Sequence, residues 1–221
     1  MISGPEFHHG RDVLRLKLDD QIEIIDGKGK AAQTTVIKIS KHEIIVQIDS
    51  IATFEPAVPK ISLATAIPKF SHQEALVQMT AQIGISAIFP IIFERSSVRE
   101  KFRSEKWYRW TIEAAKQSGL NHLPLINELV MFIGFVKKIS DYDLIIAGHT
   151  KTSVNDLNLK IKDAINILII VGPEGGFTQA EILRLNEINA LPMKVGSNVL
   201  RIETAAVGLT AVARFLTIAV R

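Results

Sequence analysis

The sequence predicts an α/β protein with a small β domain at its N-terminus. From Ile61 onward, apolar runs of strand length alternate with helical stretches, the pattern of parallel strands joined by helices. Before that point, strand-like runs are separated by turn residues alone. Because Pro56 and Pro59 lie between the two patterns, we place one domain over residues 1–58 and the other over residues 60–221.

Composition excludes several classes of protein. The 221 residues are 47% hydrophobic, enough for a sizeable core, and none is a cysteine, which excludes disulfides and thiolate metal sites. No cluster of ligand residues predicts a metal, and no signal peptide is evident. The most apolar stretch, Ala205–Val220, contains Arg214 and is short for a membrane span. We expect a cytoplasmic protein without a membrane partner, whose net charge of +3 permits an RNA partner.

The N-terminal part predicts a set of antiparallel strands. An Asp-Gly pair at Asp26-Gly27 between strand-like runs is a hairpin signal. The expected strands are Val13–Leu18, Ile22–Ile25, Thr35–Ile39 and Ile44–Ile48. Charge is nearly balanced here, so a domain used only for packing stays an alternative to one that binds RNA.

The second part opens with a strand–helix–strand unit. Ile61–Ile67 and Ala87–Ile92 are the strands, and Gln73–Gly84 is the helix between them, with Ser71 as N-cap and Glu74 at the capping-box position. Such a unit implies parallel strands.

A basic stretch with interleaved aromatic residues follows. Basic side chains could contact phosphates, and aromatic ones could stack on bases. The alternative is a solvated amphipathic helix whose Trp107 and Trp110 lie in the core. The basic residues are Arg95, Arg99, Lys101, Arg103, Lys106 and Arg109.

Two glycine-containing loops each follow a strand. Gly172–Gly176 comes after the strand Ile167–Val171, and Gly196 comes after the strand Pro192–Val195. Thr178 stands three residues before Glu181, the spacing of a capping box. A third strand, Tyr142–Ala147, ends in Gly148-His149. Ligands bind at the carboxyl ends of strands in open α/β sheets, while the Walker and dinucleotide motifs are absent, which counts against kinases and dehydrogenases.

The two loops together carry a more specific signal. GPEGGF at Gly172–Phe177 and VGSNVLRIETA at Val195–Ala205 resemble the signature of the RsmE-type family, 16S ribosomal RNA uridine-N3 methyltransferases of the SPOUT superfamily. The resemblance implies S-adenosylmethionine as cofactor, 16S ribosomal RNA of the small subunit as substrate, a homodimer, and a C-terminal parallel-sheet domain with a deep trefoil knot.

The resemblance extends to the N-terminal part. His8 or His9, Val13-Leu14-Arg15 and Asp26-Gly27-Lys28-Gly29 match the pattern of the family's PUA-like RNA-binding β-barrel. Asp19-Asp20 stands where the family has Gly-Asp, and the family's strand upstream of this region is missing, so we expect an incomplete barrel.

The resemblance also implies the site residues. Main-chain and polar groups of the two loops and of the third strand's end would hold the cofactor, and basic residues of both domains would hold RNA. The expected cofactor residues are Ala147, Gly148, Val171, Gly172, Gly175, Gly176, Val195, Gly196, Val199, Leu200, Arg201, Glu203 and Thr204. The expected RNA-binding residues are Arg11, Arg15, Lys17, Lys69, Arg95, Arg99 and Glu174.

Uridine N3 carries a proton, so methylation needs a base or stabilisation of the anion on the uracil oxygens. Arg201 suits the second role as a fixed cation with several donors. Glu203 could orient Arg201, cap the following helix or act as a base, and we rank the base last.

Some positions depart from the family pattern. A non-catalytic RNA-binding protein with the same fold, or a methyltransferase acting on another RNA, therefore stays an alternative. The departures are Met79, Gln82, Leu120, His149 and Asn198.

The last stretch, Thr204–Ala219, predicts a helix that is apolar around most of its circumference. Such a helix must be buried on more than one side, and a two-fold partner is the commonest way to supply the second surface. The alternative is a monomer in which the β domain covers this helix.

Overall fold

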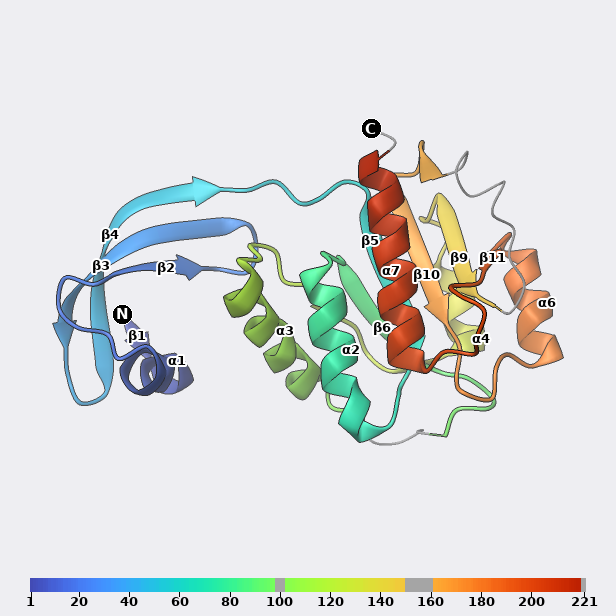
Figure 1. The fold of residues 1–221 in the computed structure, drawn as a ribbon, viewed down its shortest axis with the longest axis horizontal. Helices are drawn as coiled ribbons and strands as arrows, with labels where there is room; N and C mark the ends of the chain where they lie inside the picture. Colours follow the sequence, from blue (N-terminus) through green and yellow to red (C-terminus); the bar gives the residue numbers. More distant parts are fainter. Residues whose placement is uncertain (98–101, 150–160, 220–221) are drawn as a thin grey trace. The chain divides into compact units, whose positions relative to one another are not determined.

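The computed structural model describes residues 1–97, 102–149 and 161–219. The chain divides into two compact units, unit 1 (Met1–Pro56) and unit 2 (Ala57–Arg221), shown in Figure 1. The division falls beside the proline pair that separates the two sequence patterns.

Unit 1 is a four-stranded antiparallel half-barrel with one short helix, α1 (Gly4–His8). Its core is small and centres on Phe7, Val36 and Ile44. The expected strands at 22–25, 35–39 and 44–48 are confirmed within longer strands. In spatial order the strands are β1 (Ile2–Ser3), β4 (Glu43–Thr53), β3 (Lys30–Ile39) and β2 (Gln21–Ile25).

The expected strand over Val13–Leu18 is wrong. The chain makes a π-helical turn over His9–Val13 and then an irregular segment in which Arg15 has φ +53°. Positive φ is incompatible with a strand. At Gly10 a Cβ would lie 3.0 Å from the Ile44 side chain, so this glycine lets the turn approach the core.

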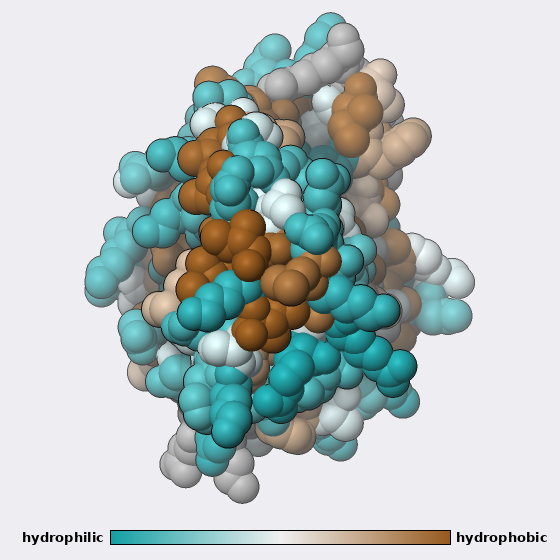
Figure 2. Space-filling view, turned by 90° about the vertical axis from the view of Figure 1, so that its left-hand side faces the viewer, coloured by the Kyte–Doolittle hydropathy of each residue, from teal (hydrophilic) through white to brown (hydrophobic). Residues whose placement is uncertain are grey.

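Unit 1 exposes several large apolar side chains. Figure 2, which looks at the side drawn on the left in Figure 1, shows apolar side chains gathered in one area surrounded by hydrophilic ones. The exposed large apolar residues of this unit are Met1, Val13, Leu14, Leu18, Ile37, Ile48, Ile51 and Phe54.

Unit 2 is built on a parallel sheet, which confirms the predicted α/β class. Its central strands are buried along nearly their whole length, as their continuous apolar sequences require. In spatial order the strands are β11 (Leu191–Met193), β9 (Leu144–Gly148), β10 (Asn166–Val171), β5 (Lys60–Ala66), β6 (Ala87–Ile92) and β7 (Leu125–Ile126), and β8 (Val130–Met131) pairs with the end of β6.

Three helices lie side by side on one face of this sheet, as Figure 1 shows. These are α3 (Ser104–Ser118), α2 (Phe70–Gln82) and α7 (Ile202–Ala219). The other described helical segments are α6 (Gln179–Glu187), α4 (Phe132–Phe135) and a 3₁₀ turn at Val136–Lys138.

Helix α2 begins earlier than expected. Lys69 is its N-cap, without a side-chain cap bond, so the expected cap at Ser71 is wrong. Gln73 holds this end instead, since its amide donates to the Pro68 carbonyl (3.1 Å) and accepts from the Trp107 indole (3.0 Å). Trp107 is fully buried, which places it in the core as the amphipathic alternative predicts.

Helix α7 packs on β5, β10 and α2 through one face. Its opposite face leaves Phe215 and Ile218 67% and 70% exposed, with Ala211 and Thr204 exposed on the same stripe. By length and composition alone α7 could also cross a membrane, a test that core helices of soluble proteins pass as well.

Candidate cofactor site and RNA interface

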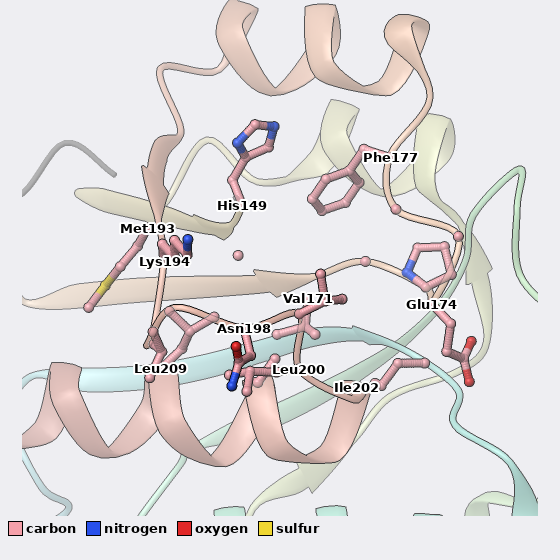
Figure 3. A pocket seen from close by; sticks show the side chains of 18 of the residues that line it. His149, Val171, Glu174, Phe177, Met193, Lys194, Asn198, Leu200, Ile202 and Leu209 are labelled. Carbon is pink, nitrogen blue, oxygen red and sulfur yellow. The ribbon is translucent and has the colours of Figure 1, made fainter. Parts of the chain in front are cut away.

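A cavity of about 340 Å³ lies where β9, β10 and β11 end. Two loops form its walls, the first loop (residues 172–177) and the second loop (residues 195–200). Figure 3 shows His149 and Phe177 on one side of the cavity, with Leu200, Ile202 and Leu209 on the other. The site therefore occupies the strand ends that parallel α/β sheets use for ligands.

The structure brings most of the expected cofactor residues together around this cavity. Arg95 and Glu174, expected for RNA, line it too. The expected cofactor residues in its lining are Gly148, Val171, Gly172, Gly175, Gly176, Val195, Val199 and Leu200.

Five expected cofactor residues are not among those that line the cavity. Ala147 is buried in β9. Gly196 makes a left-handed turn with φ +80°. Arg201, Glu203 and Thr204 lie where α7 begins.

The sequence did not single out the apolar part of the lining. Ile202, Ala205 and Leu209 sit on one face of α7 at spacings of three and four, a helical signal that was available. Phe177, the last residue of the first loop, lines the cavity with its ring. The remaining unpredicted lining residues are Pro173, Ile182, Met193, Lys194 and Ser197.

The first loop is held by a predicted capping box, which is confirmed. The Thr178 hydroxyl accepts from the backbone N–H of Glu181 (3.3 Å), and the Glu181 carboxylate accepts from the N–H of Thr178 (2.8 Å). The second carboxylate oxygen accepts from the N–H of Glu94 (2.9 Å). The buried Glu181 therefore joins the first loop to the segment that follows β6.

Further contacts hold the same loop. Arg95 donates to the Gly175 carbonyl (3.0 Å), and Phe177 packs edge-on against Phe93 (5.5 Å between ring centroids). A Cβ at Gly172 would lie 2.8 Å from the Phe177 ring, closer than real contacts allow. The ring and the loop backbone therefore pack directly on each other.

The second loop is held by far fewer contacts. Among the described parts of the chain, residues 195–200 make no hydrogen bond. Val199 is 85% exposed although it borders an apolar cavity. Gly196 supplies a backbone conformation that side chains with a Cβ rarely adopt.

Arg201 and Glu203 meet a residue that the sequence did not predict. One nitrogen of the His72 imidazole lies 3.5 Å from the Arg201 guanidinium, and the other lies 3.4 Å from the Glu203 carboxylate. The Glu203 side chain is 15% exposed, so this contact is half-buried. Packing of α2 on α7 brings these three side chains together.

Two departures from the family pattern lie at the cavity. His149 and Asn198 both line it, the former at the end of β9. The backbone N–H of His149 donates to the Met193 carbonyl (2.9 Å), which extends the pairing of β9 with β11.

The expected RNA-binding residues are exposed where the structure describes them. Arg11 forms a two-point ion pair with Asp12, whose pKa the Arg11 hydrogen bond lowers, so part of its charge is already compensated. Arg99 lies outside the described residues. Arg15, Lys17, Lys69, Arg95 and Glu174 are exposed.

Within residues 1–97, 102–149 and 161–219, no group of three or more His, Asp or Glu side chains is placed to hold a metal ion. The described chemistry at the site is therefore that of glycine main chain, apolar side chains and a few polar groups.

Comparison with known proteins assigns the chain. The model of the RNA methyltransferase domain matches residues 55–214, and that of the RNA methyltransferase PUA domain matches residues 2–49. Ribosomal RNA small subunit methyltransferase E of Rickettsia conorii is 30% identical over 220 residues, 98% of this chain and 89% of the relative. The Bacillus subtilis protein of the same name is 28% identical over 92% of this chain and 85% of the relative.

Solved structures agree. A putative methyltransferase from Legionella pneumophila, in complex with the cofactor SAM, is 30% identical and superposes with a TM-score of 0.85 over 97% of this chain and 90% of that one. A ribosomal RNA small subunit methyltransferase E from Neisseria gonorrhoeae, bound to S-adenosyl methionine, is 26% identical with a TM-score of 0.87 over 97% and 91%. The resemblance carried by the two glycine loops is thus confirmed, and the chain belongs to the RNA methyltransferase family that contains ribosomal RNA small subunit methyltransferase E.

Proposed function

We propose that this protein transfers a methyl group from S-adenosylmethionine to N3 of a uridine in 16S ribosomal RNA of the small subunit. The observation that carries the proposal is the cavity between the two loops, in a chain similar to two solved methyltransferases that hold S-adenosylmethionine. The alternative target, another RNA, would use the same cavity.

The cavity fits the cofactor. Its volume lies in the range of small-ligand pockets, and its lining combines apolar side chains with main chain at Gly172 and Gly176. Glycine leaves backbone amides and carbonyls accessible to a ligand at close range. Gly148, Gly172, Gly176, Val199 and Leu200 would hold it through main-chain groups.

The cofactor supplies an electrophilic methyl group on a good leaving group, so the protein mainly has to position the uridine and manage its charge. Removing the N3 proton leaves negative charge on the uracil oxygens. Arg201 would stabilise that charge, and Glu203 would keep Arg201 in place. The base must be unpaired or extruded to reach the site.

The RNA would contact basic residues of both units. In unit 2 these are Lys69, Arg95 and the sequence-predicted Arg99, with Glu174 at the cavity mouth. In unit 1 they are Arg11, Arg15 and Lys17. These assignments come from the family resemblance and are supported by the exposure of the described side chains.

We also propose a homodimer through α7. Phe215 and Ile218 form an exposed apolar stripe with Ala211, and apolar stripes of this kind mark interaction surfaces. A two-fold axis would bury the stripe against its copy. The trefoil knot and the PUA-like role of residues 1–58 stay predictions of the same resemblance. A cytoplasmic location stays a prediction from the composition of the sequence.

The dimer is tested by sedimentation of the full chain and of Phe215→Asp. The wild type is expected to sediment as a dimer at micromolar concentration and the variant as a folded monomer. A wild-type monomer would contradict the proposed interface.

Mass spectrometry of ribosomal RNA tests the function itself. RNA from a strain that lacks this gene should lose one methylated uridine of 16S ribosomal RNA, and purified protein with S-adenosylmethionine should restore it. If the Arg201→Ala variant restores the methylation at the wild-type rate, Arg201 has no role in the reaction. Cofactor binding without methylation of any small-subunit RNA would favour the non-catalytic alternative.

A further inference from the structure

The most informative feature outside the cavity lining is the row of three side chains Arg201, His72 and Glu203. His72 lies in the first turn of α2, and its two ring nitrogens face the other two residues at 3.5 and 3.4 Å. No sequence motif links His72 with the loops, and it lies far from them along the chain.

The chemistry of the two neighbours selects one form of the ring. A carboxylate accepts hydrogen bonds and a guanidinium only donates them. Nδ1 lies 3.4 Å from the Glu203 carboxylate, so a proton on Nδ1 is the favourable arrangement there, and Nε2, 3.5 Å from the Arg201 guanidinium, can then offer its lone pair. The other neutral tautomer would set donor against donor and acceptor against acceptor. A doubly protonated ring would turn an N–H toward the Arg201 cation.

The surroundings explain why Arg201 needs such a partner. It directly follows the second loop, in which residues 195–200 make no hydrogen bond within the described chain. His72 instead belongs to a helix whose start is anchored by the buried contact between Gln73 and Trp107. The imidazole therefore connects the exposed Arg201 side chain to a rigid element.

We propose that His72 is a positioning residue that holds the Arg201 guanidinium toward the uracil, with Glu203 fixing the tautomer of His72. The proposal rests on the proposed function, because it takes Arg201 as the group that stabilises the uracil anion. It assigns Glu203 an indirect role: the carboxylate orients the ring and does not remove the N3 proton. The arrangement is that of a carboxylate–histidine pair whose histidine serves the reacting centre through its second nitrogen.

Two substitutions separate the two contacts of the ring. A glutamine amide reaches roughly the place of Nε2, so His72→Gln can keep an acceptor for Arg201. An asparagine amide reaches roughly the place of Nδ1, so His72→Asn can keep a donor for Glu203 only. His72→Ala removes both, and the neighbouring exposed Ser71→Ala is the matched control.

Methyl transfer to small-subunit RNA by the full-length protein is the measurement. His72→Ala is expected to lower kcat about 10- to 100-fold, the range for residues that act through a reacting group, with little change in the Kd for S-adenosylmethionine. His72→Gln should recover much of the loss and His72→Asn should not. In the Arg201→Ala background, His72→Ala should have almost no further effect. An unchanged kcat in His72→Ala, or better recovery by asparagine than by glutamine, overturns the proposal.

A measurement without turnover keeps this inference apart from the proposed function. Long-range ¹H–¹⁵N spectra of the full-length protein at about pH 8 should show the tautomer of His72 that carries its proton on Nδ1. In Glu203→Gln the preference for that tautomer should fall. A proton on Nε2 in the wild type overturns the inference even if methylation is observed. Absence of methylation together with the Nδ1–H form would overturn the proposed function alone.

Discussion

The two loops that enclose the cavity differ in how they are held. The first loop is fixed by Glu181, by the Arg95 side chain and by the packing of Phe177. The second loop has no hydrogen bond in the described chain and leaves Val199 almost fully exposed. One wall is thus preformed, and the other is free to adjust when a ligand enters.

This difference assigns separate tasks to the two walls. A fixed wall binds a cofactor without ordering cost, since it already has its bound shape. An adjustable wall can close over the cofactor and the target base. Arg201 lies at the end of the adjustable wall and is linked to α2 through His72. We therefore expect substitutions in the first wall to change cofactor affinity, and those at the end of the second to change turnover.

The largest expected effect is that of Arg201→Ala. If Arg201 stabilises the uracil anion as proposed, its loss should lower kcat about 10²- to 10³-fold with little change in cofactor affinity. Single-turnover kinetics and calorimetry of S-adenosylmethionine binding measure the two quantities. If cofactor affinity falls by the same factor as the rate, the second loop would also govern cofactor binding, and the proposed division of tasks between the two loops would be wrong.

The next effect is that of Gly172→Ala in the fixed wall. The added Cβ would collide with Phe177 and displace it, at a cost of about 1–3 kcal/mol. Calorimetry should therefore show that the Kd for S-adenosylmethionine rises by about tenfold or more. Gly134→Ala is the control, because a Cβ there meets no atom within 4 Å. Equal affinities in both variants would show that Phe177 can move freely.

Glu181→Gln should have a smaller effect, mainly on stability. The carboxylate accepts hydrogen bonds from two backbone N–H groups, and the NH₂ of the glutamine amide would face one of them, donor against donor. We expect this to lower the free energy of unfolding by about 1–3 kcal/mol. Glu187→Gln on the same helix is exposed and should stay within about 0.5 kcal/mol. Urea denaturation compares them, and identical midpoints would contradict the bracing role of Glu181.

The smallest effect is expected at the amino ends of β9 and β10, the ends far from the cavity. The Asp143 carboxylate accepts from the N–H groups of Asn166 and Ile165, and these bonds lower its pKa. Because the pKa of this carboxyl is lower in the folded than in the unfolded state, where it is about 3.9, its ionised form stabilises the fold at pH values above the unfolded pKa. This stabilisation is lost as the pH falls through the folded-state pKa. The Tm difference between wild type and Asp143→Asn should therefore shrink below about pH 4, with cofactor affinity unchanged. Asp141→Asn is the control, and a pH-independent difference would contradict the assignment.

Local signals predicted much of this site. The Thr178–Glu181 capping box, the strands before the loops and the glycine positions all depend on contacts within a few residues, so the sequence displays them. The strand–helix–strand unit and the parallel sheet likewise follow from periodicity. The cavity forms because parallel strands end at the same edge, which topology alone ensures.

The failures concern contacts between distant segments. Val13–Leu18 has strand composition, but Gly10 and the positive φ at Arg15 turn the chain into a π-helical turn and an irregular segment. His72 had no detectable signal, because its role depends on the packing of α2 against α7. A side chain whose partners lie in another helix cannot be recognised from its own neighbours.

The place of β10 in the sheet has a kinetic consequence. This strand pairs with β5 on one side and β9 on the other, and Asn166 is in register with Lys60 from the start of the unit. Pairing of such distant segments is slow, because a long loop must close before the contact stabilises it. The first loop continues directly from β10, so the cavity can form only after this late insertion. Refolding followed by the binding of S-adenosylmethionine and by hydrogen exchange should therefore show binding competence as the last step to appear.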